Sequence, residues 1–182
     1  MQDLKDTLRQ CFEGRVCLMG IGNVDYSDDG FGVVLAEKIE ERFRARESGD
    51  RHEVINAGTV PERFIEPVVE KDFDHFIFFD AVDVGAEGGS VVFLDAEEIM
   101  SLYPQFSTHK ISLGLIAKLI GRNGRTKTWL LGVQPGSVGI GQGFTEEVKG
   151  TLNILEDVLW ELLHAAPPAP PYHKRMDQEC LI

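Results

Sequence analysis

The chain has few cysteines and few basic residues, and each shortage excludes a class of protein. Three thiols, Cys11, Cys17 and Cys180, form no CxxC pair. This odd, sparse set indicates a reducing compartment rather than a disulfide framework. Lys and Arg number 18 against 30 Asp and Glu, a formal net charge of -12, which argues against nucleic acid or an anionic membrane as a partner.

Long hydrophobic segments are also missing. No run approaches the roughly 20 apolar residues of a membrane span, and no apolar signal-peptide core stands near the N-terminus. With 182 residues, of which 43% are hydrophobic, the chain is large enough for one globular domain with a full core. We assign this domain to residues 1–164 and expect the Pro-rich residues 165–182 to form a flexible tail. Because neither a membrane span nor a signal peptide is recognised, we expect a cytoplasmic protein. We also expect it to be a monomer.

The motifs of common nucleophilic hydrolases do not occur. No G-x-S-x-G elbow is found, and Gly88-Gly-Ser-Val lies in a predicted turn rather than between a strand and a helix. Neither Cys11 nor Cys17 stands at an electropositive helix N-terminus. A serine or cysteine nucleophile is therefore not predicted.

What the sequence does contain is an alternation of apolar runs and helical patterns. The runs are residues 16–21, 53–56, 76–82, 91–94 and 128–133, and the helical patterns are residues 1–12, 31–43, 61–70, 96–102, 112–120 and 145–163. Continuous runs suit strands covered on both faces. We predict a three-layer α/β/α sandwich with a mostly parallel five-stranded sheet. Because only a Gly-rich turn precedes residues 91–94, we expect them to form an antiparallel edge strand beside the preceding strand.

The most informative segment is Leu18–Gly32, in which a Gly-rich turn leads to two adjacent carboxylates. Gly20 and Gly22 stand where the first strand becomes a loop, as in a dinucleotide-binding turn. However, Asp28 and Asp29 occupy the place where a bound phosphate would sit, and a carboxylate pair suits a cation instead. The acidic residue that a nucleotide binder needs about 20 residues further on is also missing from a strand context.

Three side chains are candidate metal ligands because they map to the carboxyl ends of strands, where open α/β sheets bind ligands. Asp29 follows the first strand, Asp80 ends the third apolar run, and His109 precedes the predicted helix 112–120. Two carboxylates and one imidazole can hold Ni²⁺ or Zn²⁺ with positions left open for water or substrate. An aspartic dyad of Asp29 and Asp80 sharing one proton is the alternative, although it leaves His109 unexplained.

The same residues also have structural interpretations. Asp28 is interpreted as a helix N-cap or as a residue that supports the ligands from behind, and capping explains one of the two adjacent aspartates but not both. Asp80 could accept hydrogen bonds from loop N–H groups, and His109 by itself fits a surface loop equally well. Asp83 is the competing carboxylate, and we interpret it as a turn residue.

Across residues 15–163, several ordered motifs together resemble the hydrogenase maturation endopeptidases. They are Gly20-Ile-Gly-Asn with Asp28-Asp29-Gly30, Asn56-Ala-Gly-Thr59, Phe79-Asp80-Ala81, Ser107-Thr-His109 and Gly132-Val-Gln-Pro135. The resemblance places Asp29, Asp80 and His109 on the three metal-contacting positions of the family, which are also the expected catalytic residues.

The resemblance implies an endopeptidase whose partner is the large-subunit precursor of a nickel–iron hydrogenase. The nickel would belong to the precursor and dock on the three side chains, after which a C-terminal extension beyond a Cys-x-x-Cys motif would be removed. Either the nickel or a carboxylate, Asp29 or Asp80, would then activate the attacking water. A nickel-sensing chaperone that inspects the large subunit without cutting it is the alternative on the same scaffold.

Overall fold

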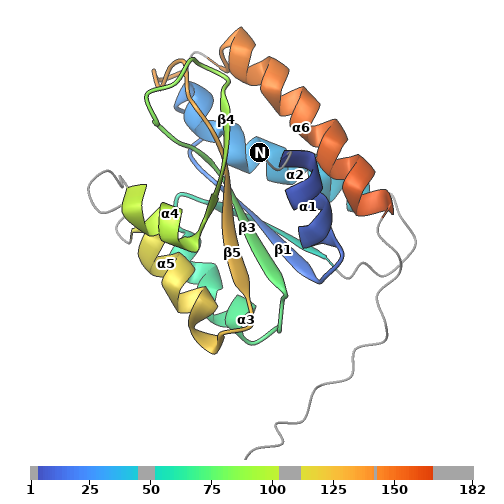
Figure 1. Cartoon of the computed structure of the whole chain (residues 1–182). Coiled ribbons are helices and arrows are strands. Elements are labelled where there is room, and N and C mark those ends of the chain that lie inside the picture. The colour runs from blue at the N-terminus through green and yellow to red at the C-terminus, as the bar shows by residue number, and fades with distance from the viewer. Residues whose placement is uncertain (1–3, 45–51, 103–111, 142, 166–182) are drawn as a thin grey trace, which may run out of the picture.

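The structure is a computed structural model that describes residues 4–44, 52–102, 112–141 and 143–165 (Figure 1). Five strands form one central sheet: β1 (Val16–Ile21), β2 (Glu53–Gly58), β3 (His75–Ala81), β4 (Val91–Asp95) and β5 (Lys127–Val133). The helices are α1 (Leu4–Phe12), α2 (Phe31–Arg44), α3 (Ile65–Val69), α4 (Ala96–Leu102), α5 (Leu113–Ile120) and α6 (Glu146–Ala165). Three short 3-10 turns are η1 (Ser27–Gly30), η2 (Pro61–Phe64) and η3 (Gly121–Asn123).

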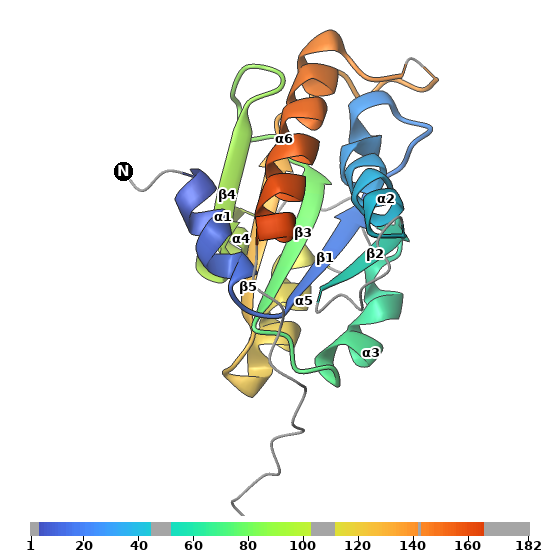
Figure 2. The ribbon, with the colours of Figure 1, turned by 90° about the vertical axis from the view of Figure 1, so that its right-hand side faces the viewer.

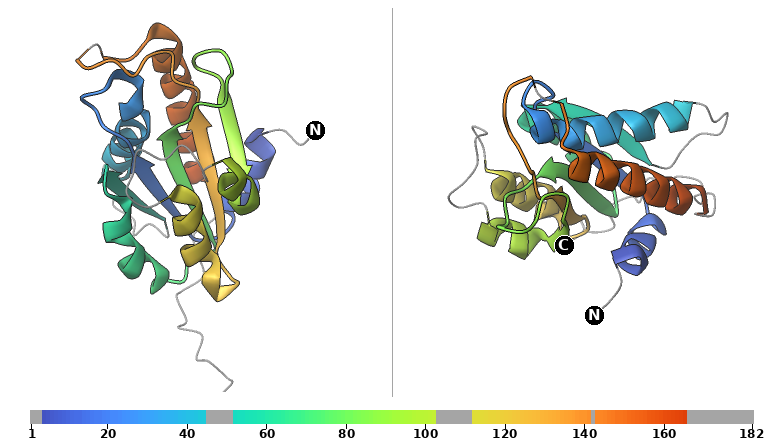
Figure 3. Two further views of the ribbon diagram at one scale, coloured as in Figure 1. Left: turned by 90° about the vertical axis from the view of Figure 1, so that its left-hand side faces the viewer. Right: turned by 90° about the horizontal axis from the view of Figure 1, so that it is seen from above.

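Helices cover both faces of the sheet, which confirms the predicted three-layer sandwich. Helices α1, α2 and α6 lie on one face (Figure 2), and α3, α4 and α5 lie on the other (Figure 3). Alternate residues of β3 enter the two cores: Ile77 and Phe79 pack beneath α2 and α6, whereas Phe76 and Phe78 face α5. This explains why the strand sequences are continuously apolar.

The strand order is β2-β1-β3-β5-β4, with the first four strands parallel and β4 antiparallel to β5. An antiparallel edge strand was predicted and is present, but the expectation that it pairs with its predecessor β3 is wrong. Strand β5 lies between β3 and β4, so the Gly-rich segment 82–90 crosses over the end of β5 instead of closing a hairpin. Two backbone hydrogen bonds hold the crossing segment against the residue that follows β5. Gly89 N–H donates to the Gln134 carbonyl at 2.9 Å, and Gln134 N–H donates to the Ser90 carbonyl at 2.8 Å.

Most helices begin and end close to their predicted positions. Ser112 is the N-cap of α5, and its side chain accepts a hydrogen bond from Leu115 N–H. The predicted helix 61–70 is instead divided into η2 and α3. In the described part of the chain, no helix combines the length and the apolar character that crossing a membrane requires.

His75, at the start of β3, is held as a neutral imidazole. Its ring stacks on Trp129, and the Trp129 indole N–H donates to His75 Nδ1 at 3.0 Å. Burial, followed by the charge of Lys127, lowers the pKa of His75 below its ordinary value. Protonation therefore disrupts a contact that joins β3 to β5.

We expect the protein to lose stability as the pH falls below about 6.5, the pKa of an unperturbed histidine. The unfolded chain binds a proton at His75 near that pH, whereas the folded chain binds it only at lower pH, so stability rises with pH across the interval. Thermal midpoints at pH 7.5 and 5.5 test this against His75→Phe, which keeps an aromatic ring beside Trp129 and cannot titrate. The wild type should lose more on acidification than the variant, and equal losses would contradict the assignment.

Candidate functional site

Glycines bring the first turn of α2 directly onto the strand backbones. A Cβ atom on Gly32 would lie 2.0 Å from the Phe79 carbonyl oxygen and 2.4 Å from that of Ile21. A Cβ on Gly20 would lie 2.3 Å from the Gly32 carbonyl oxygen. Because no other residue type fits, the signature glycines place η1 over the carboxyl ends of β1 and β3.

This place is also the topological switch point of the sheet. The chain leaves β1 to form β2 on one side, and then returns to form β3 on the other side of β1. Open α/β sheets bind ligands in the crevice that such a reversal creates. η1 contacts β3 here, so Asp29 of η1 and Asp80 of β3 belong to two elements that meet at the place where a ligand is expected.

Asp29 is half-buried and is fixed by one hydrogen bond to its carboxylate. Its Oδ2 accepts from Asn23 N–H at 2.8 Å, and its own N–H donates to the Tyr26 carbonyl at 3.0 Å. Among the described residues, Oδ1 receives no hydrogen bond. Gly22 allows this close arrangement, since it has φ +134° and a Cβ there would lie 1.8 Å from the Asp29 carbonyl oxygen.

Asp80 is the second predicted carboxylate, and it lies near the end of β3 with only 4% of its surface exposed. Its Oδ1 accepts a hydrogen bond from Ala81 N–H at 2.9 Å. A buried carboxylate is costly to ionise unless donors or a cation compensate it. Asp80 therefore combines the two interpretations given by the sequence, because it bonds to the adjoining backbone and stands at the ligand-binding edge.

His109 lies outside the described residues, in the segment that connects α4 and α5. Within the described ranges, no group of three His, Cys, Asp or Glu side chains could hold a metal ion. The structure thus places Asp29 and Asp80 on two elements that meet at the carboxyl edge of the sheet, and all three ligand assignments stay predictions.

Asp28 has a structural role that the sequence did not reveal. Its fully buried carboxylate accepts four hydrogen bonds of 2.8–2.9 Å, from the backbone N–H groups of Gly136, Ser137 and Thr145 and from the Thr145 hydroxyl. The interpretation of Asp28 as an N-cap is wrong, because these partners lie 108 to 117 residues away. Asp28 ties η1 to the loop that leads from β5 into α6.

Gln134 plays the corresponding role for the loop after β3. Its buried Oε1 accepts from Val84 N–H at 2.8 Å and from Ala86 N–H at 3.2 Å, and its Nε2 donates to Asp83 at 3.1 Å. Asp83 also accepts from Gly85 N–H, which confirms it as a turn residue. The motif Gly132–Pro135 therefore shapes the edge of the site rather than supplying a ligand.

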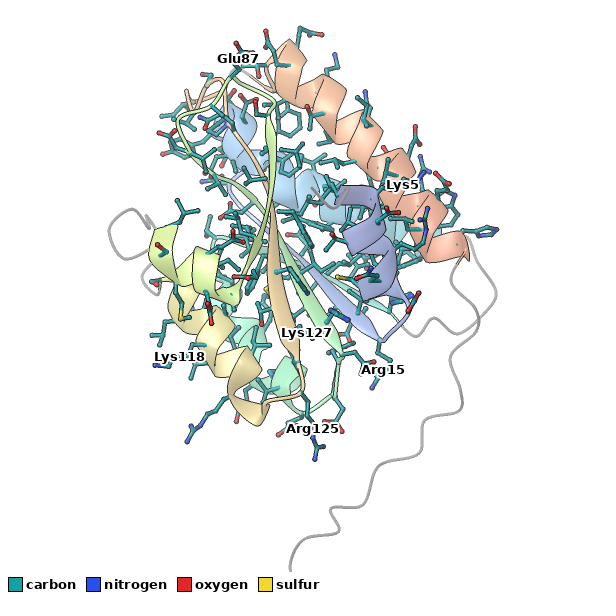
Figure 4. All side chains as sticks on the ribbon, viewed as in Figure 1. Lys5, Arg15, Glu87, Lys118, Arg125 and Lys127 are labelled. Atoms are coloured by element: carbon teal, nitrogen blue, oxygen red, sulfur yellow. The ribbon has the colours of Figure 1, made fainter. Side chains whose placement is uncertain are left out.

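The segments that follow β1, β3 and β5 at the carboxyl edge of the sheet are acidic. Residues 21–30, 80–90 and 134–147 contain no Lys, Arg or His, and their acidic residues are Asp25, Asp28, Asp29, Asp80, Asp83, Glu87, Glu146 and Glu147. Figure 4 shows Glu87 at this end of the molecule and Arg15, Lys118, Arg125 and Lys127 toward the opposite end. Such an edge attracts cations and repels phosphate, which argues further against a nucleotide binder.

The described thiols are unsuited to nucleophilic catalysis. Cys11 and Cys17 are both buried in the cores that flank the sheet. Burial raises the pKa of Cys11 to about 11 and raises that of Cys17 still further. Both thiols are therefore protonated at neutral pH, whereas a cysteine nucleophile must be a thiolate.

The fold and the site define an α/β protein that carries paired carboxylates, rather than a phosphate-binding turn, at its switch point. The sequence model of the hydrogenase maturation proteases matches residues 33–161, and the chain belongs to this family. The protein is accordingly a peptidase. The matched range contains Asp80 and His109 and begins shortly after Asp29.

Named relatives match nearly the whole domain. The hydrogenase 3 maturation protease of Escherichia coli K12 is 27% identical over 146 residues, which are 79% of this chain and 89% of the relative. The crystal structure of a NiFe hydrogenase maturation protease from Thermococcus kodakarensis KOD1 has a TM-score of 0.75 at 28% identity, covering 87% of this chain and 99% of that one. A hydrogenase maturating endopeptidase from Escherichia coli has a TM-score of 0.66 at 26% identity, covering 83% and 91%.

Proposed function

We propose that this peptidase removes a C-terminal extension from the large-subunit precursor of a nickel–iron hydrogenase after nickel has been inserted. Membership of the maturation protease family supports the reaction class. The observation that supports the proposal is the contact between η1, which carries Asp29, and β3, which carries Asp80, at the switch point of the sheet. A crevice formed by adjoining parallel strands is where a ligand is expected in this fold.

In this proposal the nickel arrives with the substrate and contacts Asp29, Asp80 and His109. The acidic segments 21–30, 80–90 and 134–147 support the arrangement, because they contain eight carboxylates and no Lys or Arg and therefore favour a divalent cation. Carboxylate oxygens and an imidazole are suitable donors for Ni²⁺. The docked nickel would polarise the scissile carbonyl, and a carboxylate oxygen such as Asp29 Oδ1 would accept a proton from the attacking water.

The decisive experiment incubates the purified chain with nickel-loaded precursor, with nickel-free precursor, and with large subunit already truncated at its mature end. Mass spectrometry of the products should show one released C-terminal peptide from the nickel-loaded precursor only. Equal cleavage without nickel would remove the metal from the mechanism. Binding of nickel-loaded precursor without any cleavage would instead support the nickel-sensing chaperone.

We expect the isolated protein to retain little nickel. Two carboxylates and one imidazole at an exposed strand edge complete no coordination shell until the substrate supplies further ligands. After dialysis against a chelator, elemental analysis should find less than about 0.1 equivalent of nickel, a level expected for a weak and incomplete site. One equivalent surviving the chelator would show a resident metal, and its loss from Asp29→Asn with Asp80→Asn would locate it at these carboxylates.

A further inference from the structure

Two loops beside Asp29 expose a group of large apolar side chains. Val24 and Tyr26 follow β1, and Val138 and Ile140 follow β5. Their exposed fractions are 57%, 41%, 57% and 72%, in that order. In the described part of the chain, none of the four packs into either hydrophobic core. We call these four side chains the apolar rim.

The apolar rim is one preformed surface because its two loops are joined by hydrogen bonds. Gly141 N–H donates to the Asp25 carbonyl at 2.9 Å, and Asp28 N–H donates to the Ser137 carbonyl at 3.1 Å. The buried Asp28 carboxylate adds its bonds to Gly136 and Ser137. Figures 1 and 2 show the two loops at the same end of the sheet. A surface held in this way loses little conformational entropy when it binds a partner.

The rim directly adjoins the Asp29 carboxylate. The hydrogen bond to Asp29 Oδ2 comes from Asn23, the residue before Val24, and the Asp29 N–H bonds to the carbonyl of Tyr26. Val24 also packs closely on η1, since a Cβ on Gly30 would lie 2.9 Å from the Val24 Cα. A chain lying on the rim would therefore pass beside the candidate catalytic carboxylate.

We propose that the apolar rim docks an extended segment of the substrate polypeptide next to the scissile bond, with apolar side chains on the rim and neutral or basic residues alongside. This inference rests on the proposed function and identifies the surface that recognises the substrate. A peptidase has to hold the backbone beside the reacting bond, and the rim adjoins Asp29 on η1, the element that contacts β3. The acidic loops around the rim disfavour an acidic segment.

A second copy of this chain is a poorer occupant of the rim. Pairing two rims would bring together two edges that each carry eight acidic residues and no basic ones in residues 21–30, 80–90 and 134–147. Like charges facing each other across an interface oppose association. A neutral or basic segment of another protein meets no such repulsion.

The test replaces Val138 and Ile140 by serine in one double variant and measures cleavage of nickel-loaded precursor. The KM should rise at least about tenfold, because two apolar contacts are lost from binding, while kcat stays within about threefold. Ile154→Ser is the matched control, since Ile154 is 65% exposed on α6 and lies outside the rim. Its KM should equal that of the wild type. Thermal midpoints of both variants verify that the proteins are folded.

The outcomes separate the rim from the proposed function. If the wild type cleaves no precursor, the proposed function is wrong, and this conclusion does not depend on the role of the rim. If the wild type cleaves and the double variant has an unchanged KM, the docking proposal alone is overturned. Sedimentation could also show that the wild type and Ile154→Ser are dimers and that the double variant is a monomer. Together with an unchanged KM, that result would assign the rim to contact with a second copy of the chain.

Discussion

Asp29→Asn and Asp80→Asn should each abolish precursor processing while leaving the protein folded, and His109→Ala should do the same. Asparagine can keep the bond from Asn23 N–H to position 29 through its amide oxygen, so the η1 geometry survives. Neutralising one of two neighbouring carboxylates also relieves their repulsion in the metal-free protein. The same change removes a charge that an incoming Ni²⁺ needs.

We expect processing by each variant to fall at least about 100-fold, a loss typical of removing a group that stabilises the transition state. Thermal midpoints should stay within about 3 °C of the wild type, about 1 kcal/mol for a domain of this size. Asp83→Asn and His164→Ala are controls, because both residues are exposed and neither is a proposed ligand. His75→Ala is unsuitable, since that ring packs on Trp129. Full processing by one variant would exclude that residue, and full processing by two would exclude nickel docking.

Asp28→Asn should lose stability and activity together, whereas the same substitution at the adjacent Asp29 should lose activity alone. Oδ1 of Asp28 accepts from Thr145 N–H, and Oδ2 accepts from Gly136 N–H, Ser137 N–H and the Thr145 hydroxyl. An amide must direct its NH₂ group at one of these sets of donors. At least one buried N–H then has no acceptor, and the loops after β1 and β5 separate beside the crevice.

The expected cost of Asp28→Asn is about 2–4 kcal/mol, because an unsatisfied buried donor and a lost charge-assisted bond add together. For a domain of this size it corresponds to a fall in thermal midpoint of about 5–15 °C. Differential scanning calorimetry measures the shift, and Asp25→Asn is the control because Asp25 is exposed in the same loop. A wild-type midpoint for Asp28→Asn would show that the four bonds contribute nothing to stability.

The layers of the fold, and the edge of the sheet at which Asp29 and Asp80 lie, were predictable because they depend on local patterns. Continuous apolar runs such as Phe76–Val82 indicate covered strands, and in a parallel sheet the residues that follow them meet at one edge. This reasoning put Asp29 and Asp80 at the carboxyl edge, where the structure has them, whereas their role as ligands stays a prediction. It depends only on where strands end and needs no knowledge of distant contacts.

The partners of Asp28 and of β4 were not predictable in this way. The bonds of Asp28 reach residues more than a hundred positions away, and no spacing in the sequence indicates them. The error over β4 came from applying a local turn rule to Gly85–Gly89, when a strand from much later in the chain occupies the intervening place. Both features belong to the packing of distant segments rather than to the local sequence.

The insertion of β5 between β3 and β4 has a consequence for folding during synthesis. Until Lys127–Val133 leaves the ribosome, β3 can pair with β1 on one side, but its native partner on the other side is missing, and so is the partner of β4. Any hairpin formed between β3 and β4 in the meantime would have to be broken before the native sheet could close, and the insertion of β5 is in either case a non-local step, which contact order predicts to be slow. The edge that carries Asp80 therefore reaches its final form late in biogenesis, after the whole sheet has been translated.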